Sequence, residues 1–394
     1  MERLDILALD PWNAGSHRAV VDSISRHSAH RWHWCTGEGG GVRWCLRHSG
    51  LAFAERIRRE AGESGPWDLV LVSSLCSLSD FRAAAPAAVR SLPHVLCMHE
   101  NQAAYPVSDR VRPRDRERDA HLSFTNLASI VAADHVIWNS RYNLESFLEA
   151  MDPLLRRSTI PVEPGWEERI RDKSSVSWPP VDVPDVPGST TRALHNPGLD
   201  GYGDRPQGDR PVVRVAWPHR WEHDKGCEEL EALIGRCRDD DRFEFRWSIL
   251  GHRFDEVPAA MQRIERNHGA VLDRFGGPAN RGDYLEALGG CDWVCSTARH
   301  EFFGIAVVEG LLMGCLPWLP DRLSYPELLP ECWRGLDPWT PGLDPIRVRQ
   351  SIRSHLEPAR APAAVAHLDG LLAKSGNPEP APAPRAPDST PKVS

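Results

Sequence analysis

Residues 291–318, with the sequence CDWVCSTARHEFFGIAVVEGLLMGCLPW, contain the pattern that decides the fold. The apolar run at 293–296 predicts a buried strand, and a polar turn follows it. Residues 305–313 predict a helix, because apolar side chains recur there at spacings of three and four. Gly314 is placed to end that helix, and residues 315–319 predict the next strand. A strand, a turn, a helix and a further strand are the repeating unit of an α/β sheet.

The start of that helix is a candidate phosphate site. Its first N–H groups have no partner within the helix, and the helix dipole favours an anion there. Gly304, in the turn, allows a close approach of the backbone. Glu301 could meet a ligand hydroxyl, and Glu309 could accept both hydroxyls of a ribose. The alternatives are a capping role for Glu301 and a solvated position on the helix for Glu309.

The composition is that of a soluble globular protein with two domains. The chain has 394 residues, of which 41% are hydrophobic and 26% are charged, and this length suffices for two ordinary domains. The net charge of −8 gives no global attraction to nucleic acid, so an RNA partner would need a local basic patch. The ten cysteines contain no CxxC pair, which indicates buried, reduced thiols. The first residues do not resemble a signal peptide and no apolar run reaches membrane-spanning length, so we expect a cytoplasmic protein that does not bind membranes.

The first half of the chain alternates apolar runs with amphipathic ones. This rhythm predicts a parallel sheet covered by helices on both faces. In such sheets, ligands bind beyond the carboxyl ends of the strands. The expected strands lie at 4–9, 69–73, 94–98 and 135–139.

Two loops at those strand ends carry candidate site residues. The loop after the first strand contains a glycine, a serine and a histidine, although a mere tight turn is an open alternative. The loop after the strand at 94–98 begins with His99, which could bond a sugar hydroxyl or steady developing charge. The alternative for His99 is to cap a buried loop. The candidates of both loops are Gly15, Ser16, His17, His99, Glu100, Asn101 and Gln102.

Two other stretches of the first half have two possible interpretations. Trp32, Trp34 and Trp44 could line a wall for a base or a sugar, or belong to a partly packed loop. Residues 109–119 hold five arginines, which could grip a phosphate backbone or form a solvated loop.

The second half begins after a change of composition. Many Pro, Gly, Asp and Ser residues with little periodicity predict a linker, and the Pro- and Ala-rich end predicts disorder. A strand at 212–217 precedes a loop with Arg220 and Lys225, two cations that suit a diphosphate, although an ordinary basic loop is the alternative. The expected segments are a first domain at 1–187, a linker at 188–211, a second domain at 212–375 and a tail at 376–394.

Several motifs resemble those of known glycosyltransferases. Two Rossmann-like units with two basic residues and two glutamates in the second resemble the GT-B fold, and the glutamates match the EX7E motif of retaining, nucleotide-sugar-dependent members. The strings WPHRWEHDKG, MHENQ followed by YPV, FTNLASIVAADHVIWNSRYNLESFL and STARHEFFGIAVVEG are more specific. They resemble the glycosyltransferase-like domain-containing family, whose animal member is the tRNA-queuosine α-mannosyltransferase. The first loop departs from it, because relatives often carry two glycines before the serine where this chain has NAGSH.

This resemblance implies an α/β, GT-B protein with two Rossmann-like domains facing across a cleft. It implies transfer of mannose from GDP-mannose, with retention, to an acceptor such as queuosine in tRNA(Asp), with no cofactor and no metal. Another nucleotide sugar, a small-molecule acceptor, or a non-catalytic nucleotide- or RNA-binding protein are the alternatives. The implied catalytic residues are His99, Arg220, Lys225 and Glu301. The implied donor-binding residues are Arg220, Lys225, Glu301, Phe303, Gly304, Ile305 and Glu309, and the implied acceptor-side residues are Gly15, Ser16, His17, Glu100, Asn101 and Gln102.

Overall fold

The computed structural model describes residues 2–38, 41–62, 65–106, 113–160, 164–185, 210–253 and 256–376, with side chains of the helix that begins at Pro113 described from residue 120. Most of the predicted linker, nearly all of the predicted tail and the side chains of the arginine-rich segment lie outside these residues. None of the helices in the described ranges has both the length and the hydropathy that a membrane span needs.

The first unit is built on a parallel six-stranded sheet in the order β2-β1-β3-β4-β5-β6. Its central strands are buried on both faces, which is why their sequences are continuous apolar runs. The predicted strands are confirmed, and two further strands complete the sheet. The strands are β1 (Asp5–Asp10), β2 (Arg31–Thr36), β3 (Leu69–Ser73), β4 (His94–Met98), β5 (His135–Trp138) and β6 (Ser174–Val176).

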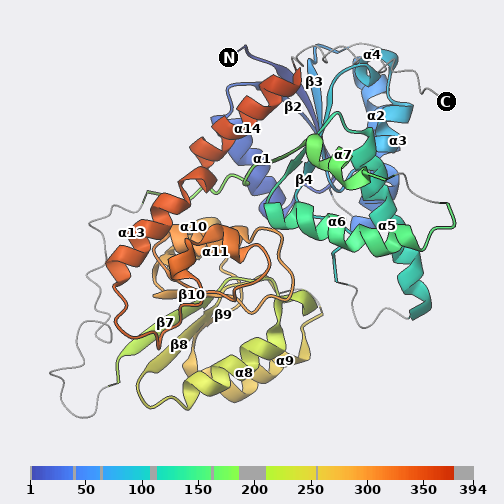
Figure 1. The fold of residues 1–394 in the computed structure, drawn as a ribbon. Helices are drawn as coiled ribbons and strands as arrows, with labels where there is room; N and C mark the ends of the chain where they lie inside the picture. Colours follow the sequence, from blue (N-terminus) through green and yellow to red (C-terminus); the bar gives the residue numbers. More distant parts are fainter. Residues whose placement is uncertain are drawn as a thin grey trace, which may run out of the picture.

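Helices cover both faces of this sheet (Figure 1). Side-chain caps begin some of these helices; for example, the Ser140 hydroxyl accepts a hydrogen bond of 2.9 Å from the Asn143 N–H at the start of α6. Their bounds are α1 (Gly15–His27), α2 (Val42–Ala61), α3 (Leu78–Ala84), α4 (Ala87–Arg90), α5 (Pro113–Ala132), α6 (Arg141–Arg156) and α7 (Trp166–Asp172).

The second unit is a parallel five-stranded sheet in the order β11-β10-β7-β8-β9. Trp217, Trp247 and Trp293 fill its core and are almost fully buried. The strands are β7 (Val212–Trp217), β8 (Glu244–Ile249), β9 (Leu272–Phe275), β10 (Trp293–Cys295) and β11 (Leu316–Trp318). The helices are α8 (Cys227–Arg238), α9 (Ala259–His268), α10 (Arg281–Gly289), α11 (Ile305–Leu312), α12 (Tyr325–Leu328) and α13 (Pro345–His355).

The last described helix, α14 (Ala361–Gly376), lies on the first sheet and not with the second unit, where the sequence placed it. Val365, Leu368 and Leu372 on α14 join a core cluster with Leu4 and Ile6 of the first unit. Figure 1 shows α14 beside α1, although the two helices are far apart in the sequence. The apolar stripe of α14 therefore covers a face of the first sheet, and the chain crosses between the units a second time.

The strand orders place the ligand edges of the two units. In the second sheet, β7 lies between β8 and β10, so the direction of connection reverses at β7 and β10. In the first sheet the same reversal occurs at β1 and β3. Ligands of doubly wound sheets bind at the carboxyl ends of strands beside such a reversal. The carboxyl edges of the two units also contact each other, because the rings of Tyr105 and His300 lie 4.8 Å apart.

Candidate active site

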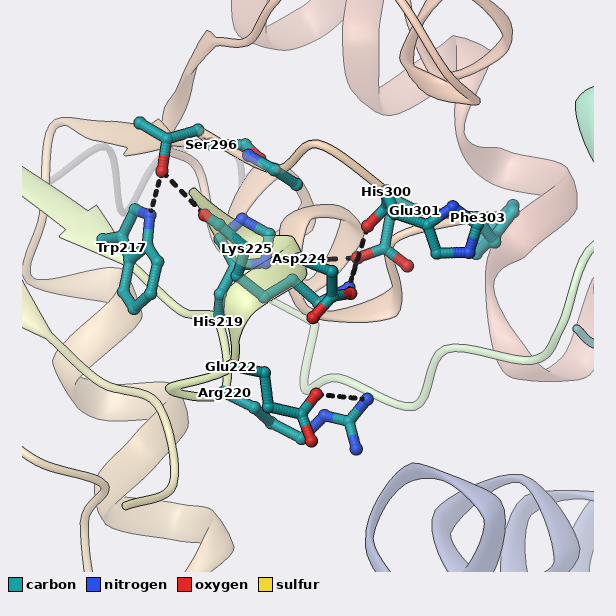
Figure 2. Close-up of polar contacts among 12 residues, drawn as sticks. Trp217, His219, Arg220, Glu222, Asp224, Lys225, Ser296, His300, Glu301 and Phe303 are labelled. Atoms are coloured by element: carbon teal, nitrogen blue, oxygen red, sulfur yellow. Dashed lines mark hydrogen bonds and ion pairs between the residues drawn. The ribbon is translucent and has the colours of Figure 1, made fainter. Parts of the chain in front are cut away.

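Lys225 is the centre of the polar cluster at the carboxyl end of β7. Its side chain is buried, and Nζ donates a hydrogen bond of 2.9 Å to the carbonyl oxygen of His300. The same Nζ lies 2.9 Å from Oδ2 of Asp224 and 3.4 Å from Oε2 of Glu301. Burial alone would lower the pKa of Lys225, but Glu301 and Asp224 outweigh it and raise the pKa. Figure 2 shows these groups pointing toward one another. Lys225 is therefore a fixed cation in the interior.

The backbone of two loops holds this cluster together. Gly226 has φ of +68°, and a Cβ there would lie 2.1 Å from the carbonyl oxygen of Thr297. Only glycine permits both this conformation and this approach. The Thr297 hydroxyl donates to the carbonyl oxygen of Lys225 at 2.9 Å and accepts a bond of 2.9 Å from the Trp217 indole. The loop after β7 is thus tied to the loop after β10.

Two neutral imidazoles border the cluster. Nδ1 of His219 lies 4.0 Å from Oε2 of Glu301, and both His219 and His300 are buried. Burial, with the charge of Lys225, lowers the pKa of His219 to about 3 and that of His300 to about 4. Nε2 of each ring is buried and has no partner among the described residues. These rings carry no charge at neutral pH, and each leaves one ring nitrogen available.

Arg220 lies on the same loop as Lys225 but is more exposed. Its guanidinium lies 3.2 Å from Oε2 of Glu222, and its side chain is 55% exposed. Figure 2 shows this pair apart from the cluster around Lys225. Both predicted cations are therefore at the carboxyl end of β7, but each is already paired with carboxylates. An anion would have to compete with Glu222 and Glu301 for them.

The predicted turn before α11 has the expected geometry. Gly304 adopts φ of +94° and is the residue before the helix begins at Ile305. The neighbouring Phe303 is buried, and its carbonyl oxygen accepts a bond of 3.0 Å from the Ser324 hydroxyl. The first N–H groups of α11, which have no partner within the helix, therefore lie near Glu301, as the sequence predicted.

Glu309 is neither solvated nor exposed. It is buried, and its Oε1 lies 2.6 Å from the Arg281 guanidinium on α10. Burial raises the pKa of Glu309, while Arg281 and a hydrogen bond from Tyr284 act in the opposite direction. The interpretation of Glu309 as a surface residue is therefore wrong. Arg281, which holds this carboxylate, was not found from the sequence, because nothing local links it to a residue on another helix.

The carboxyl edge of the first sheet carries a second cluster. Asp10 ends β1, and its buried carboxylate lies 3.7 Å from Nδ1 of His17. The rings of His17 and His99 meet edge to face at 4.3 Å, and the Ser74 hydroxyl lies 3.1 Å from Nδ1 of His99. Burial, with the nearby His17, lowers the pKa of His99 to about 3. Asp10 and Ser74 were missed, although both directly follow or end apolar strands as His99 does.

The other predicted acceptor-side residues divide between two environments. The Gln102 side chain donates a bond of 2.8 Å to Oε1 of Glu100. Burial raises the pKa of Glu100, although His17, Arg220 and Lys225 counteract it. Glu100 and Gln102 are therefore bonded to each other just after the carboxyl end of β4.

Asn101 faces away from this edge. It is fully buried, and its amide donates to the Asn143 side chain at 2.8 Å and to the Ser146 hydroxyl at 3.3 Å. Its prediction as an acceptor-side residue is wrong, because its polar atoms are used within the first unit. Gly15 and Ser16, by contrast, are exposed at the start of α1.

Among the residues that the structure describes, no three His, Cys, Asp or Glu side chains are arranged to hold a metal ion. Both clusters instead combine carboxylates with cations or imidazoles.

The chain is similar to proteins of known activity over most of its length. A family model described as tRNA-queuosine alpha-mannosyltransferase N-terminal matches residues 5–181. The tRNA-queuosine alpha-mannosyltransferase of Drosophila melanogaster is 30% identical over 347 residues, which cover 83% of this chain and 82% of that protein.

Solved structures show the same fold at lower identity. Anabaena HepE in complex with UDP and glucose has a TM-score of 0.55 and 16% identity, and the match covers 95% of this chain and 99% of that one. A UDP-forming α,α-trehalose-phosphate synthase from Burkholderia xenovorans has a TM-score of 0.58 and 12% identity, with the same coverage of 95% and 99%. The predicted α/β, GT-B fold is confirmed.

Proposed function

The chain belongs to the tRNA-queuosine alpha-mannosyltransferase family and is a glycosyltransferase, and from this premise we propose that it moves mannose from GDP-mannose to queuosine in tRNA(Asp), with retention of configuration. The observation that carries the donor side of this proposal is the position of Lys225. It is a buried cation at the carboxyl end of β7, beside Glu301 and the first N–H groups of α11. This arrangement suits a sugar nucleotide bound by its diphosphate.

The proposed donor site assigns a role to each part of the cluster. Arg220 and Lys225 bind the diphosphate, and the backbone N–H groups at Phe303, Gly304 and Ile305 add hydrogen bonds. Binding displaces Glu301 from Lys225, and Glu301 then accepts bonds from hydroxyls of the sugar. Before binding, Glu301 lies 3.4 Å from Lys225.

Glu309 binds the ribose in this proposal. One of its oxygens already lies 2.6 Å from Arg281, so that guanidinium fixes the orientation of the carboxylate. Tyr284 also bonds to this carboxylate, so the ribose hydroxyls share its oxygens with these two side chains. Arg281 thus acts through Glu309 and is a positioning residue.

The proposed reaction occurs on one face of the sugar. The bond between the anomeric carbon and the diphosphate breaks as Arg220, Lys225 and the start of α11 stabilise the negative charge of the leaving group. A hydroxyl of the acceptor attacks the anomeric carbon from the same side, and its proton passes to the departing phosphate oxygen. His99 faces the sugar from the first unit as a neutral hydrogen-bonding group. Two cations and the helix dipole offset the diphosphate charge, so we propose transfer that needs no metal.

Calorimetry tests the donor site directly. GDP and GDP-mannose are titrated into the wild-type protein and into the variants Arg220→Ala, Lys225→Ala and Glu309→Ala. Each lost charge-assisted contact should weaken binding by roughly 1.5–3 kcal/mol, or about ten- to hundredfold. Arg238→Ala, at an exposed residue of α8, is the matched control and should bind as wild type. Unchanged affinity in all three site variants would remove the assignment.

Mass spectrometry of tRNA tests the acceptor. Purified protein with GDP-mannose should add one hexose to queuosine in tRNA(Asp), and a deletion strain should lack the hexosylated nucleoside. UDP-glucose is the comparison donor, because a solved structure of the same fold carries UDP. Transfer from UDP-glucose alone would replace the proposed donor, and unmodified tRNA with every donor would replace the proposed acceptor.

A further inference from the structure

Trp44 presents an indole ring to solvent at the start of α2. Its side chain is 71% exposed, and it is the only tryptophan among the large exposed apolar side chains of the described ranges. The two other tryptophans nearby are different. Trp32 and Trp34 lie on β2, stack on each other at 5.0 Å, and donate hydrogen bonds from their indoles to serines of the first unit. The Trp44 ring, by contrast, is not packed into the core, so burial of apolar surface does not account for a tryptophan at this position.

The start of α2 lies against the loop between β1 and α1. Cys45, next to Trp44, is buried with its Sγ 3.9 Å from the carbonyl oxygen of Pro11. The loops after β1 and β2 are also bonded to each other, since the Gly37 N–H donates to the carbonyl oxygen of Asp10 at 2.9 Å. Burial raises the pKa of Cys45, and the charges of Asp10 and Glu100 add to that effect. The first turn of α2, which carries Trp44, is therefore beside the loop that follows β1.

Basic side chains surround this indole. Arg43, Arg47 and His48 are exposed on the first two turns of α2. Arg47 and His48 stand three and four residues after Trp44, so they share its face of the helix. The sequence has no acidic residue between Glu38 and Glu55. In a chain with a net charge of −8, this is a local surface that attracts an anion.

We propose that this surface docks the anticodon loop of the acceptor tRNA, with an unpaired base stacked on Trp44 and a phosphate bound by Arg47. The inference rests on the proposed function and extends it to the recognition of the acceptor. Proteins that bind single-stranded RNA loops stack unpaired bases on aromatic side chains and bind phosphates with arginine. Leu51 is the only other large apolar side chain exposed on α2, so the apolar area is small. A protein partner would need a larger apolar centre.

Fluorescence anisotropy with a labelled anticodon stem–loop RNA of tRNA(Asp) measures this docking. Trp44→Ala should weaken binding about tenfold, because stacking of one base on an aromatic ring has that effect. Trp44→Phe retains an aromatic face and should recover most of the affinity. Arg47→Glu should weaken binding and reduce its dependence on salt. Arg90→Glu, at an exposed residue of α4 before the amino end of β4, is the matched control and should bind as wild type.

Two further measurements separate this inference from the proposed function. GDP affinity and melting temperature of Trp44→Ala should match wild type, because the side chain is exposed and belongs to the first unit. If wild type transfers mannose to tRNA and Trp44→Ala does so equally well, the docking surface is wrong and the proposed function stands. If wild type transfers none, the proposed function fails, and the loop-RNA affinities still decide the surface. A change of sedimentation in Trp44→Ala with unchanged RNA affinity would assign the surface to self-association and overturn the inference.

Discussion

The carboxyl edges of the two sheets carry polar clusters that differ in charge: one is a cluster of ion pairs, and the other is a carboxylate with two imidazoles. In the second unit, the formal charges of Lys225, Asp224 and Glu301 meet within 3.4 Å of Lys225 Nζ. In the first unit, one buried carboxylate, that of Asp10, faces the imidazole of His17, and His99 lies next to that ring.

This difference has a physical consequence for what each edge can bind. A cation paired with carboxylates keeps its charge in the protein interior. An anionic ligand can bind that cation by replacing one of the carboxylates. A neutral imidazole such as that of His99 exchanges hydrogen bonds with hydroxyls without moving a net charge. The second unit is thus suited to the charged bridge of a sugar nucleotide, and the first unit to the hydroxyl groups of sugar and acceptor.

The largest effect should come from removing the buried cation. Lys225→Met leaves the carboxylate of Asp224, which is 1% exposed, without its partner. Breaking a buried ion pair in this way should lower the free energy of unfolding by roughly 3–5 kcal/mol. Urea denaturation at neutral pH measures it.

The matched control for that prediction is an ion pair on the surface. Arg171→Met removes the partner of Glu145, and both side chains are more than a third exposed. This exchange should cost much less, because exposed ion pairs contribute little to stability. Equal losses in the two variants would mean that the charges around Lys225 are not buried together, and the contrast between the two edges would disappear.

A smaller and purely kinetic effect is expected on the first unit. In the proposed donor complex His99 contacts the sugar as a neutral hydrogen-bonding group, so His99→Ala should lower the rate of transfer by about a hundredfold. GDP affinity should stay at the wild-type value, because we propose that the other unit binds the diphosphate. Single-turnover transfer and GDP titration measure the two quantities. A loss of GDP affinity as large as that of Lys225→Ala would show that the two edges do not divide the donor as we propose.

The smallest effect concerns the pH dependence of stability. His219 has a folded pKa of about 3, below its ordinary value, so the unfolded chain binds a proton more readily than the folded one. Its contribution is fully present above pH 6.5 and is lost as the pH falls toward the folded pKa. His219→Gln should therefore reduce the slope of unfolding free energy against pH below 6.5 by at most about 1.4 kcal/mol per pH unit.

Urea denaturation between pH 4 and 7 measures this slope. His99→Gln should have an effect of the same sign, because burial also lowers the pKa of His99 to about 3. An unchanged slope in His219→Gln would show that this imidazole is not neutral in the folded protein.

Most of the fold could be predicted from local pattern. The strands at 69–73 and 94–98 are confirmed with the same bounds, because a strand buried on both faces must be an apolar run. Strand β2 was missed because it lies at the edge of the sheet, where Arg31 and His33 remain partly exposed and break that run. The position of α14 was wrong for a different reason. An apolar stripe shows that a helix is buried, but not which of two sheets it covers.

The sequence by itself determined the two α/β units, the loop with Arg220 and Lys225, and the glycine turn before α11. These features depend on residues close together in the chain, whose periodicity and backbone preferences act locally. Only the tertiary structure decided that Asp224 and Glu301 hold Lys225, that Arg281 holds Glu309, and that Asn101 faces inward. Each of these pairings follows from strand order and from the way helices pack on the sheets, and burial without water makes the pairing of such groups obligatory.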